Sequence, residues 1–211
     1  PWLDRVPAVL EAWFSGSEAG NALADVVFGA VNPSGKLPFT FPVRLEDNGA
    51  HALGEYPGSD KVKYNESIFV GYRWHDKEQL KPLFAFGHGL SYTAFAVGNV
   101  KADRTTLAPN GSIRISADVT NTGDRAGAEV VQLYIGDEQS SLPRPVKELK
   151  GFQKVSLNPG QTRTVTFEIT PGMLQYYDDA KGAWVAEPGA FTAYVGAASD
   201  DIRGTVEFEL K

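Results

Sequence analysis

The sequence contains no cysteine, one methionine and three histidines in 211 residues. Without cysteine, disulfide bonds and thiolate metal sites are excluded. The compartment stays open, because a chain without disulfides folds in either redox environment. A periplasmic, a secreted and a cytoplasmic location therefore all fit the composition.

An excess of basic residues and a long apolar run are also missing. The chain has 20 Lys and Arg against 26 Asp and Glu, which gives a formal net charge of −6. Proteins that follow phosphate backbones concentrate Lys and Arg, so we expect no nucleic-acid partner. No apolar run approaches the roughly 20 residues that span a bilayer, so we expect no membrane partner.

The residues that commonly bind metals are scattered. His51, His75 and His88 lie far apart, and none has a partner three or four residues away. We interpret all three as loop or packing residues. The acidic pairs at 137–138 and 178–179 do not match the alternating oxygen ligands of a calcium loop. We therefore predict no metal site and no cofactor.

Nucleophile and phosphate motifs are absent as well, since the chain has no Gly-x-Ser-x-Gly elbow and no phosphate loop. Glycoside hydrolysis needs two carboxylates, but 26 acidic residues offer many chance pairs and the sequence alone names none. Glu18 and Glu66 stand out because each lies beside small residues. We interpret Glu18 as a charge at a helix N-terminus and Glu66 as an exposed or interface-paired carboxylate.

What the chain does contain begins with a helical pattern. Apolar residues at 6, 9, 10, 13 and 14 form one stripe, which predicts a helix that ends at Gly16. Ser17 is expected to cap a second helix, and Gly29 to end it. The expected buried face of this second helix consists of Leu23, Val26 and Val27.

Residues 32–35 predict a turn, and residues 37–41 predict a short strand at a sheet edge because Pro38 cannot donate to a ladder. A piece of this size cannot close a core. We interpret residues 1–42 as the C-terminal end of an α/β sandwich domain whose strands lie upstream, with a small helical cap as the alternative. The chain opens without an initiator Met, and we expect it to be part of a longer polypeptide.

Residues 43–96 are interpreted as a linker and interdomain clamp. Up to about residue 64 they are poor in apolar side chains, which is typical of a linker or a long surface loop. From residue 65 they are rich in aromatics and glycine without a helical period, which indicates extended chain over a neighbouring surface. The aromatics are Tyr72, Trp74, Phe84, Phe86, Tyr92 and Phe95. We assign them to packing between domains rather than to stacking on a sugar ring.

Residues 97–211 have the pattern of an all-β domain. Alternating apolar positions predict strands around residues 113–119, 131–135, 165–169, 191–195 and 206–210. Turn signals separate these strands. The regular spacing predicts a fibronectin type III-like β-sandwich, and the overall fold class is therefore mainly β.

Several sequence blocks together resemble the C-terminal portion of family 3 glycoside hydrolases of the β-glucosidase type. The similarity runs in order along essentially the whole chain. The blocks are WFSGSEAGNALADVVFG at 13–29, NPSGKLP at 32–38, YNESIFVGYR at 64–73, PLFAFGHGLSYT at 82–93, EVVQLYI at 129–135, KELKGF at 147–152 and NPG at 158–160.

The resemblance implies a catalytic barrel and an α/β sandwich before the β-sandwich, and retaining hydrolysis of terminal β-D-glycosides. It places an Asp nucleophile in the barrel and a Glu acid/base in a loop upstream of this chain. A barrel alone takes about 250 residues, more than the chain contains. We therefore expect no catalytic residue here and leave substrate-binding residues unassigned.

The implied role of the chain is structural. Its expected partner is the remaining N-terminal part of the same enzyme, on the same or a separate chain, and a β-glycoside or oligosaccharide would bind through that part. We predict interdomain contacts at Glu18, Glu66, Tyr72 and Arg73. The alternatives are a free-standing carbohydrate-binding or adhesive β-sandwich, and one chain of a split enzyme.

Overall fold

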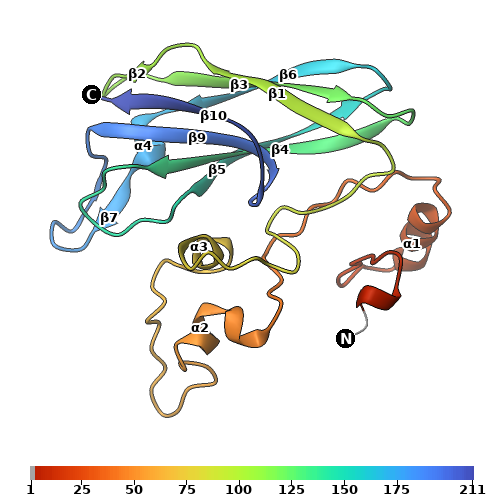
Figure 1. The fold of residues 1–211 in the computed structure, drawn as a ribbon, viewed down its shortest axis with the longest axis horizontal. Helices are drawn as coiled ribbons and strands as arrows, with labels where there is room; N and C mark the ends of the chain where they lie inside the picture. The colour runs from red at the N-terminus through yellow and green to blue at the C-terminus, as the bar shows by residue number, and fades with distance from the viewer. Residues whose placement is uncertain (1–2) are drawn as a thin grey trace.

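The computed structural model describes residues 3–211, and from residue 95 onward the chain forms two facing β-sheets (Figure 1). The smaller sheet has the order β1-β3-β6 and consists of β1 (Phe95–Ala102), β3 (Ile113–Asn121) and β6 (Thr162–Ile169). The larger sheet has the order β2-β10-β9-β4-β5 and consists of β2 (Thr106–Leu107), β10 (Asp201–Leu210), β9 (Gly189–Ala198), β4 (Gly127–Asp137) and β5 (Glu148–Leu157). All pairs are antiparallel except β2 with β10.

Outside these sheets, the short helix α4 (Pro171–Leu174) leads into a hairpin of β7 (Tyr176–Asp178) and β8 (Ala183–Val185). The five predicted strands correspond to β3, β4, β6, β9 and β10. Strands β1 and β5 were not predicted. On β5 only Val155 and Leu157 are buried, so that strand lacks the alternation that identifies a strand from sequence.

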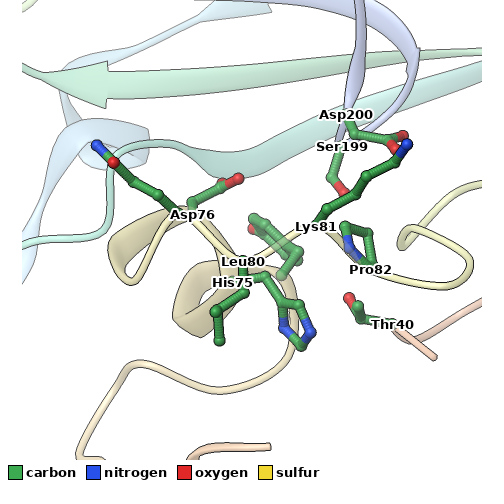
Figure 2. A pocket seen from close by; sticks show the side chains of 10 residues that line it. Thr40, His75, Asp76, Leu80, Lys81, Pro82, Ser199 and Asp200 are labelled. Carbon is green, nitrogen blue, oxygen red and sulfur yellow. The ribbon is translucent and has the colours of Figure 1, made fainter. Parts of the chain in front are cut away.

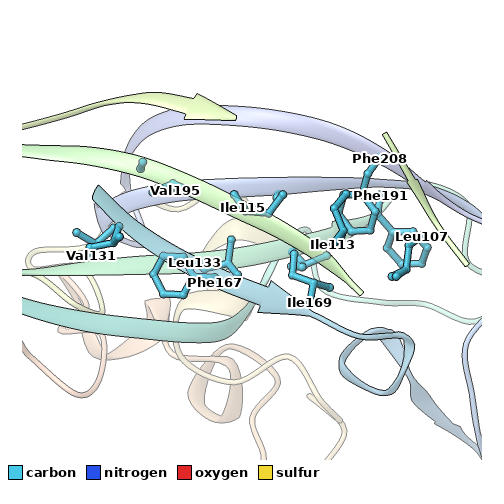
Figure 3. Packing of buried hydrophobic residues seen from close by; sticks show 14 of the residues in the cluster. Leu107, Ile113, Ile115, Val131, Leu133, Phe167, Ile169, Phe191, Val195 and Phe208 are labelled. Atoms are coloured by element: carbon cyan, nitrogen blue, oxygen red, sulfur yellow. The ribbon is translucent and has the colours of Figure 1, made fainter. Parts of the chain in front are cut away.

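The core lies between the two sheets (Figure 3). The alternation of buried and exposed residues along strand β3 explains this position of the core. Every second residue from Ile113 to Asn121 is buried and the others are more exposed. The fully buried aliphatic side chains include Leu107, Ile113, Ile115, Val119, Val131, Leu133, Val165, Ile169 and Val195. Phe191 stacks on Phe208 at the end of the core, with ring centroids 5.7 Å apart.

Strand β4 departs from the half-buried pattern that its sequence suggested. Residues 131–136 are buried without interruption. Val131, Leu133 and Ile135 face the core, whereas Gln132 and Tyr134 lie on the outer face of the larger sheet. That outer face is covered by residues from the first half of the chain.

The prediction of a helix over residues 6–14 is wrong. A single 3₁₀ turn (Leu3–Arg5) precedes it, and residues 6–18 have no helical structure. A helix of this length is marginal in water and depends on the packing of its apolar stripe. All five stripe residues are exposed instead, and Phe14 is fully so. The periodicity was present, but residues 3–211 leave the stripe largely exposed, and only Trp13 forms an aromatic contact there, edge-on to Phe39 at 5.2 Å.

The second predicted helix is present as α1 (Ala19–Val27), with two corrections. Its N-cap is Glu18 rather than Ser17, and the Glu18 carboxylate accepts a hydrogen bond from the Asn21 amide at 2.6 Å. Its predicted buried face is open, since Leu23 is 44% and Val27 is 62% exposed. Gly29 does end the helix, with the positive φ of +78° that favours glycine.

Residues 37–41 pair with residues 83–88 rather than forming a regular strand. Leu37 donates to the His88 carbonyl at 2.8 Å, and Phe41 donates to the Phe84 carbonyl at 2.8 Å. Only the Phe41–Phe84 pair qualifies as a β-bridge. Pro38 has no N–H group to donate, so the hydrogen bonds between the two segments are interrupted and do not form a continuous ladder. The turn expected at residues 32–35 does not form.

Residues 43–94 contain more structure than a linker. A 3₁₀ turn (Leu45–Asp47) and α2 (Gly49–Ala52) are followed by α3 (Tyr72–Lys77), which lies below the β4–β5 side of the sandwich in Figure 1. Six residues are too few to show a helical period, so α3 escaped prediction. Every helix in the described part is too short or too polar to cross a bilayer. Residues 1 and 2 of the predicted first segment lie outside the described residues.

Shortening a core side chain of β4 is expected to destabilise the sandwich strongly. Leu133→Ala removes a side chain with no exposure, and we expect the free energy of unfolding to fall by ~2–5 kcal/mol. The matched control is Phe152→Ala on the neighbouring strand, where the ring is 67% exposed, and we expect a change below ~1 kcal/mol. Urea unfolding of both variants checks this, and equal losses would contradict the assigned core.

Candidate functional site

The outer face of β4 is contacted by residues from the first half of the chain. Tyr134 has no exposure there. The ring of Tyr72, at the start of α3, stacks on Phe86 with centroids 5.0 Å apart and lies edge-on to Tyr134 at 5.7 Å. Three aromatic rings from three segments thus form one buried contact. Burial raises the pKa of the Tyr134 hydroxyl far above its ordinary value, so this hydroxyl remains a donor.

Gln132 connects the same segments by hydrogen bonds. Its amide nitrogen donates to the carbonyls of Gly87 at 3.2 Å and Ala197 at 2.6 Å. Its amide oxygen accepts from the Tyr134 hydroxyl. Because Gln132 is only 3% exposed, these partners replace the water that a buried amide needs.

Gly87 is required at this contact for two reasons. Its φ is +81°, which L side chains rarely adopt. A Cβ atom at this position would also lie 2.3 Å from the Gln132 amide oxygen. The backbone of residue 87 can therefore approach β4 only without a side chain.

Tyr72 and Arg73 both reach strand β5. The Tyr72 hydroxyl accepts a hydrogen bond from the Leu149 N–H at 2.9 Å, close to where the register of β4 and β5 shifts. Arg73 lies 3.4 Å from the Glu148 carboxylate. A residue of the same helix, Asp76, pairs with Lys147 at 2.6 Å. One short helix therefore makes three polar contacts with three successive residues of the chain.

Glu148 is the centre of a charged cluster at this edge. Its carboxylate accepts from Arg144 at 2.5 Å and lies 3.4 Å from Lys150. Burial alone would raise the pKa of Glu148, but the Arg144 hydrogen bond and the charges of Lys150 and Arg73 hold it below the ordinary value. Burial lowers the pKa of Lys150, and Glu148 opposes that change. Arg144 also pairs with Asp137 at 3.0 Å, so the cluster alternates in sign.

A second contact lies near the end of α1 and was not anticipated. The Asn32 side-chain oxygen accepts from the Tyr92 N–H at 2.8 Å and from the Ser91 hydroxyl at 2.9 Å. Its nitrogen donates to the Ala126 carbonyl at 3.0 Å. Asn32 thus uses its side chain to join distant segments, and this replaces the turn expected there. The Tyr92 hydroxyl extends the contact by donating to the Val26 carbonyl of α1 at 2.7 Å.

Lys36 adds a charge to this second contact. Its ammonium group donates to the Gly89 carbonyl at 2.8 Å and pairs with Glu129 of β4 at 2.7 Å. Both charged side chains are largely buried. The only sequence signal for Asn32 and Lys36 was their place in the NPSGKLP block, which sequence reasoning treated as a turn.

The structure separates the four residues predicted to make interdomain contacts. Tyr72 and Arg73 lie together on α3 and contact the sandwich, as described above. Glu18 is exposed, and its described hydrogen bond is to Asn21 within α1. Glu66 is half-buried near Gly49, and its Oε2 atom is buried with no partner among residues 3–211. The interdomain role of all four stays a prediction.

The three histidines lie in separate places. His51 packs against Tyr56 with ring centroids 4.7 Å apart, and His88 packs against Phe84 at 5.6 Å. His75 is buried on α3. Among residues 3–211, no three His, Asp or Glu side chains gather closely enough to hold a metal ion. The contacts described above hold the first half of the chain against the sandwich.

Family models match both parts of the chain. The glycosyl hydrolase family 3 C-terminal domain matches residues 1–92, and the fibronectin type III-like domain matches residues 129–199. The β-glucosidase BoGH3A of Bacteroides ovatus is 53% identical over 99% of this chain and 28% of its own length. Thermostable β-glucosidase B of Acetivibrio thermocellus is 49% identical over 96% of this chain and 27% of its own.

Solved structures agree. The structure of DesR, a β-glucosidase from Streptomyces venezuelae in complex with D-glucose, matches with a TM-score of 0.93 and 40% identity, over 100% of this chain and 27% of that chain. β-Glucosidase 3B from Thermotoga neapolitana in complex with glucose matches with a TM-score of 0.88 and 38% identity, over 99% and 29%.

The chain spans about a quarter of the length of the relatives that it matches. Within that span the match covers both the irregular first half and the sandwich. The chain therefore belongs to glycoside hydrolase family 3, in which it corresponds to the C-terminal domain and the fibronectin type III-like domain that follows it.

Proposed function

We propose that this chain is the structural C-terminal part of a retaining β-glucosidase that hydrolyses terminal β-D-glycosides. In this proposal the catalytic carboxylates belong to an upstream part of the enzyme, and this chain holds that part in place. The named relatives are β-glucosidases of which the chain covers only a fraction, which supports the proposal.

The observation that carries the proposal is the contrast in burial between the two halves. The sandwich closes its own core, whereas residues 3–92 leave many large apolar side chains exposed. Examples are Val6, Val9, Leu10, Trp13, Phe14, Leu23, Val27, Phe28, Val31, Tyr64, Val70 and Leu90. So much apolar surface on one half marks an interaction site. Most of these side chains are aliphatic, whereas a free-standing sugar-binding module would present mainly aromatic rings.

We propose the remaining N-terminal part of the same enzyme as the occupant of this surface. Residues 1–42 would complete its α/β sandwich, residues 43–96 would clamp the domains together, and residues 97–211 would buttress them. The clamp has a physical basis in the contacts of α3 and of residues 86–92 with the sandwich. The β-glycoside would bind through the upstream part.

Activity assays separate this proposal from a catalytic role for the chain. We expect the full-length protein to hydrolyse an aryl β-glucoside with retention, and the 211-residue chain alone to give no rate above buffer, because retaining chemistry needs two carboxylates in one enclosed site. Native mass spectrometry would report whether a larger polypeptide accompanies the chain. Turnover by the purified chain alone would contradict the proposal.

Glu66 provides a sharper control on the same point. We expect Glu66→Gln in the full-length protein to leave kcat within about threefold, since the carboxylate has no assigned chemistry, and Glu18→Gln to behave alike. If Glu66→Gln abolished kcat while the melting temperature stayed unchanged, Glu66 would be a catalytic residue and the proposed division of labour would be wrong.

The clamp itself can be tested at Gly87. We expect Gly87→Ala to lower the free energy of unfolding by ~2–4 kcal/mol. Placing alanine at a positive φ costs about 1 kcal/mol, and the clash of its Cβ with Gln132 costs ~1–3 kcal/mol more. The matched control is Gly182→Ala, where φ is +61° but no atom lies within 4 Å of the new Cβ. Denaturant unfolding of the two variants should differ by the clash alone, and equal losses would remove Gly87 from the clamp.

A further inference from the structure

Two cavities flank α3, and their walls differ in charge. The first has a volume of about 430 Å³ and lies between α3 and the turn that contains Ser199 and Asp200 (Figure 2). Its charges occur in opposite signs, because Asp76 pairs with Lys147 at 2.6 Å and Asp200 shares the wall with Lys81. This cavity therefore has no excess charge that would attract a partner.

The second cavity has a volume of about 440 Å³ and lies between the end of α2, residues 65–69 and α3. Its charged wall residues are Glu66, Lys77 and Glu78. Lys77 and Glu78 pair with each other at 2.8 Å, so the remaining charge of the wall is the carboxylate of Glu66. A wall with an excess negative charge favours a cation.

Glu66 has no counter-charge among the described residues. Its side chain is half-buried, and its Oε2 atom is buried with no hydrogen-bond partner among residues 3–211. In the same range no Lys, Arg or His forms an ion pair with Glu66. Lys77 is held elsewhere, since its ammonium group lies 5.0 Å from the ring centroids of both Phe69 and Trp74 and pairs with Glu78.

The neutral polar groups of the wall do not replace this counter-charge. The Asn65 amide donates to the Glu55 carboxylate. The Nε1 atom of Trp74 is buried and has no partner in the part of the chain that the structure describes, so it does not bond to Glu66 either. A carboxylate that loses water without gaining a cation destabilises a fold, and charges in such places are therefore normally paired.

The residues around Glu66 belong to the exposed apolar surface of the first half of the chain. Tyr64, Ile68 and Val70 are exposed, and so is Leu53 on the cavity wall. A partner that covers these side chains also closes the cavity and excludes water from it. The carboxylate then needs a cation that the partner itself supplies.

We propose that the remaining N-terminal part of the enzyme inserts a Lys or Arg side chain into this cavity and pairs it with Glu66. The inference rests on the proposed function, which makes that part the occupant of the surrounding apolar surface. Enough polypeptide exists for this in the relatives, since the chain spans 28% and 27% of the two named β-glucosidases. Apolar contact has no direction, and the ion pair fixes where the partner sits along the first half.

Thermal unfolding of the full-length protein and of the 211-residue chain tests the proposal. Glu66→Gln keeps the size of the side chain and removes its charge. In the full-length protein this change leaves the basic partner without its carboxylate, so we expect the melting temperature to fall by roughly 2–4 °C. In the 211-residue chain no pair is lost, and we expect no fall. Glu66→Lys places two cations together and should lower the melting temperature of the full-length protein further.

The matched control is Glu207→Gln, the same change at an exposed position on β10, which we expect to shift neither melting temperature by more than about 1 °C. An equal fall for Glu66→Gln in both proteins would place the partner of Glu66 within the chain. No fall in either protein would mean that water alone solvates the carboxylate. Either result would overturn the proposal. Turnover by the 211-residue chain alone would instead contradict the proposed function, so the two failures are distinguishable.

Discussion

The burial of strand β4 on both faces is the constraint on which the rest of the structure depends. Its inner face is apolar and completes the core, as in any sandwich. Its outer face carries Gln132 and Tyr134, whose polar groups would normally remain in water. Once they are buried they must be hydrogen-bonded, and only the backbone at residues 87 and 197 and the pair itself supply the partners. The path of residues 72–92 follows from that requirement.

The two groups of contacts along this path differ in kind. At α3 the charges alternate through Arg73, Glu148, Arg144 and Asp137, so that no single charge is buried without an opposite neighbour. At the end of α1 a neutral amide, Asn32, does most of the joining, and Lys36 with Glu129 supplies one largely buried ion pair. The first group orients a helix on a sheet, whereas the second sets where the exposed α1 leaves the sandwich.

Sequence reasoning predicted the strands of the sandwich because half-buried strands leave a period of two in the sequence, as β3 does. It failed where the environment of a side chain is set by distant residues. The stripe at residues 6–14 has a helical period, yet the described residues leave it largely exposed. Tyr134 occupies a position that alternation assigns to solvent, and a second segment buries it. Asn32 looks like a turn residue, and only the fold shows that its amide bonds to Tyr92 and Ala126.

These contacts also determine how the two halves depend on each other. The sandwich has its own closed core, formed by side chains of its two sheets. Residues 3–92 expose much apolar surface. They are joined to the sandwich by the buried contact of Tyr72 and Phe86 with Tyr134 and by polar contacts with β4, β5 and residue 126. The Tyr92 hydroxyl is bonded to the Val26 carbonyl of α1, and the Tyr92 N–H to Asn32, whose amide also reaches the Ala126 carbonyl, so one chain of hydrogen bonds joins α1 to the sandwich. The proposed support of an upstream domain by the sandwich would run through these contacts.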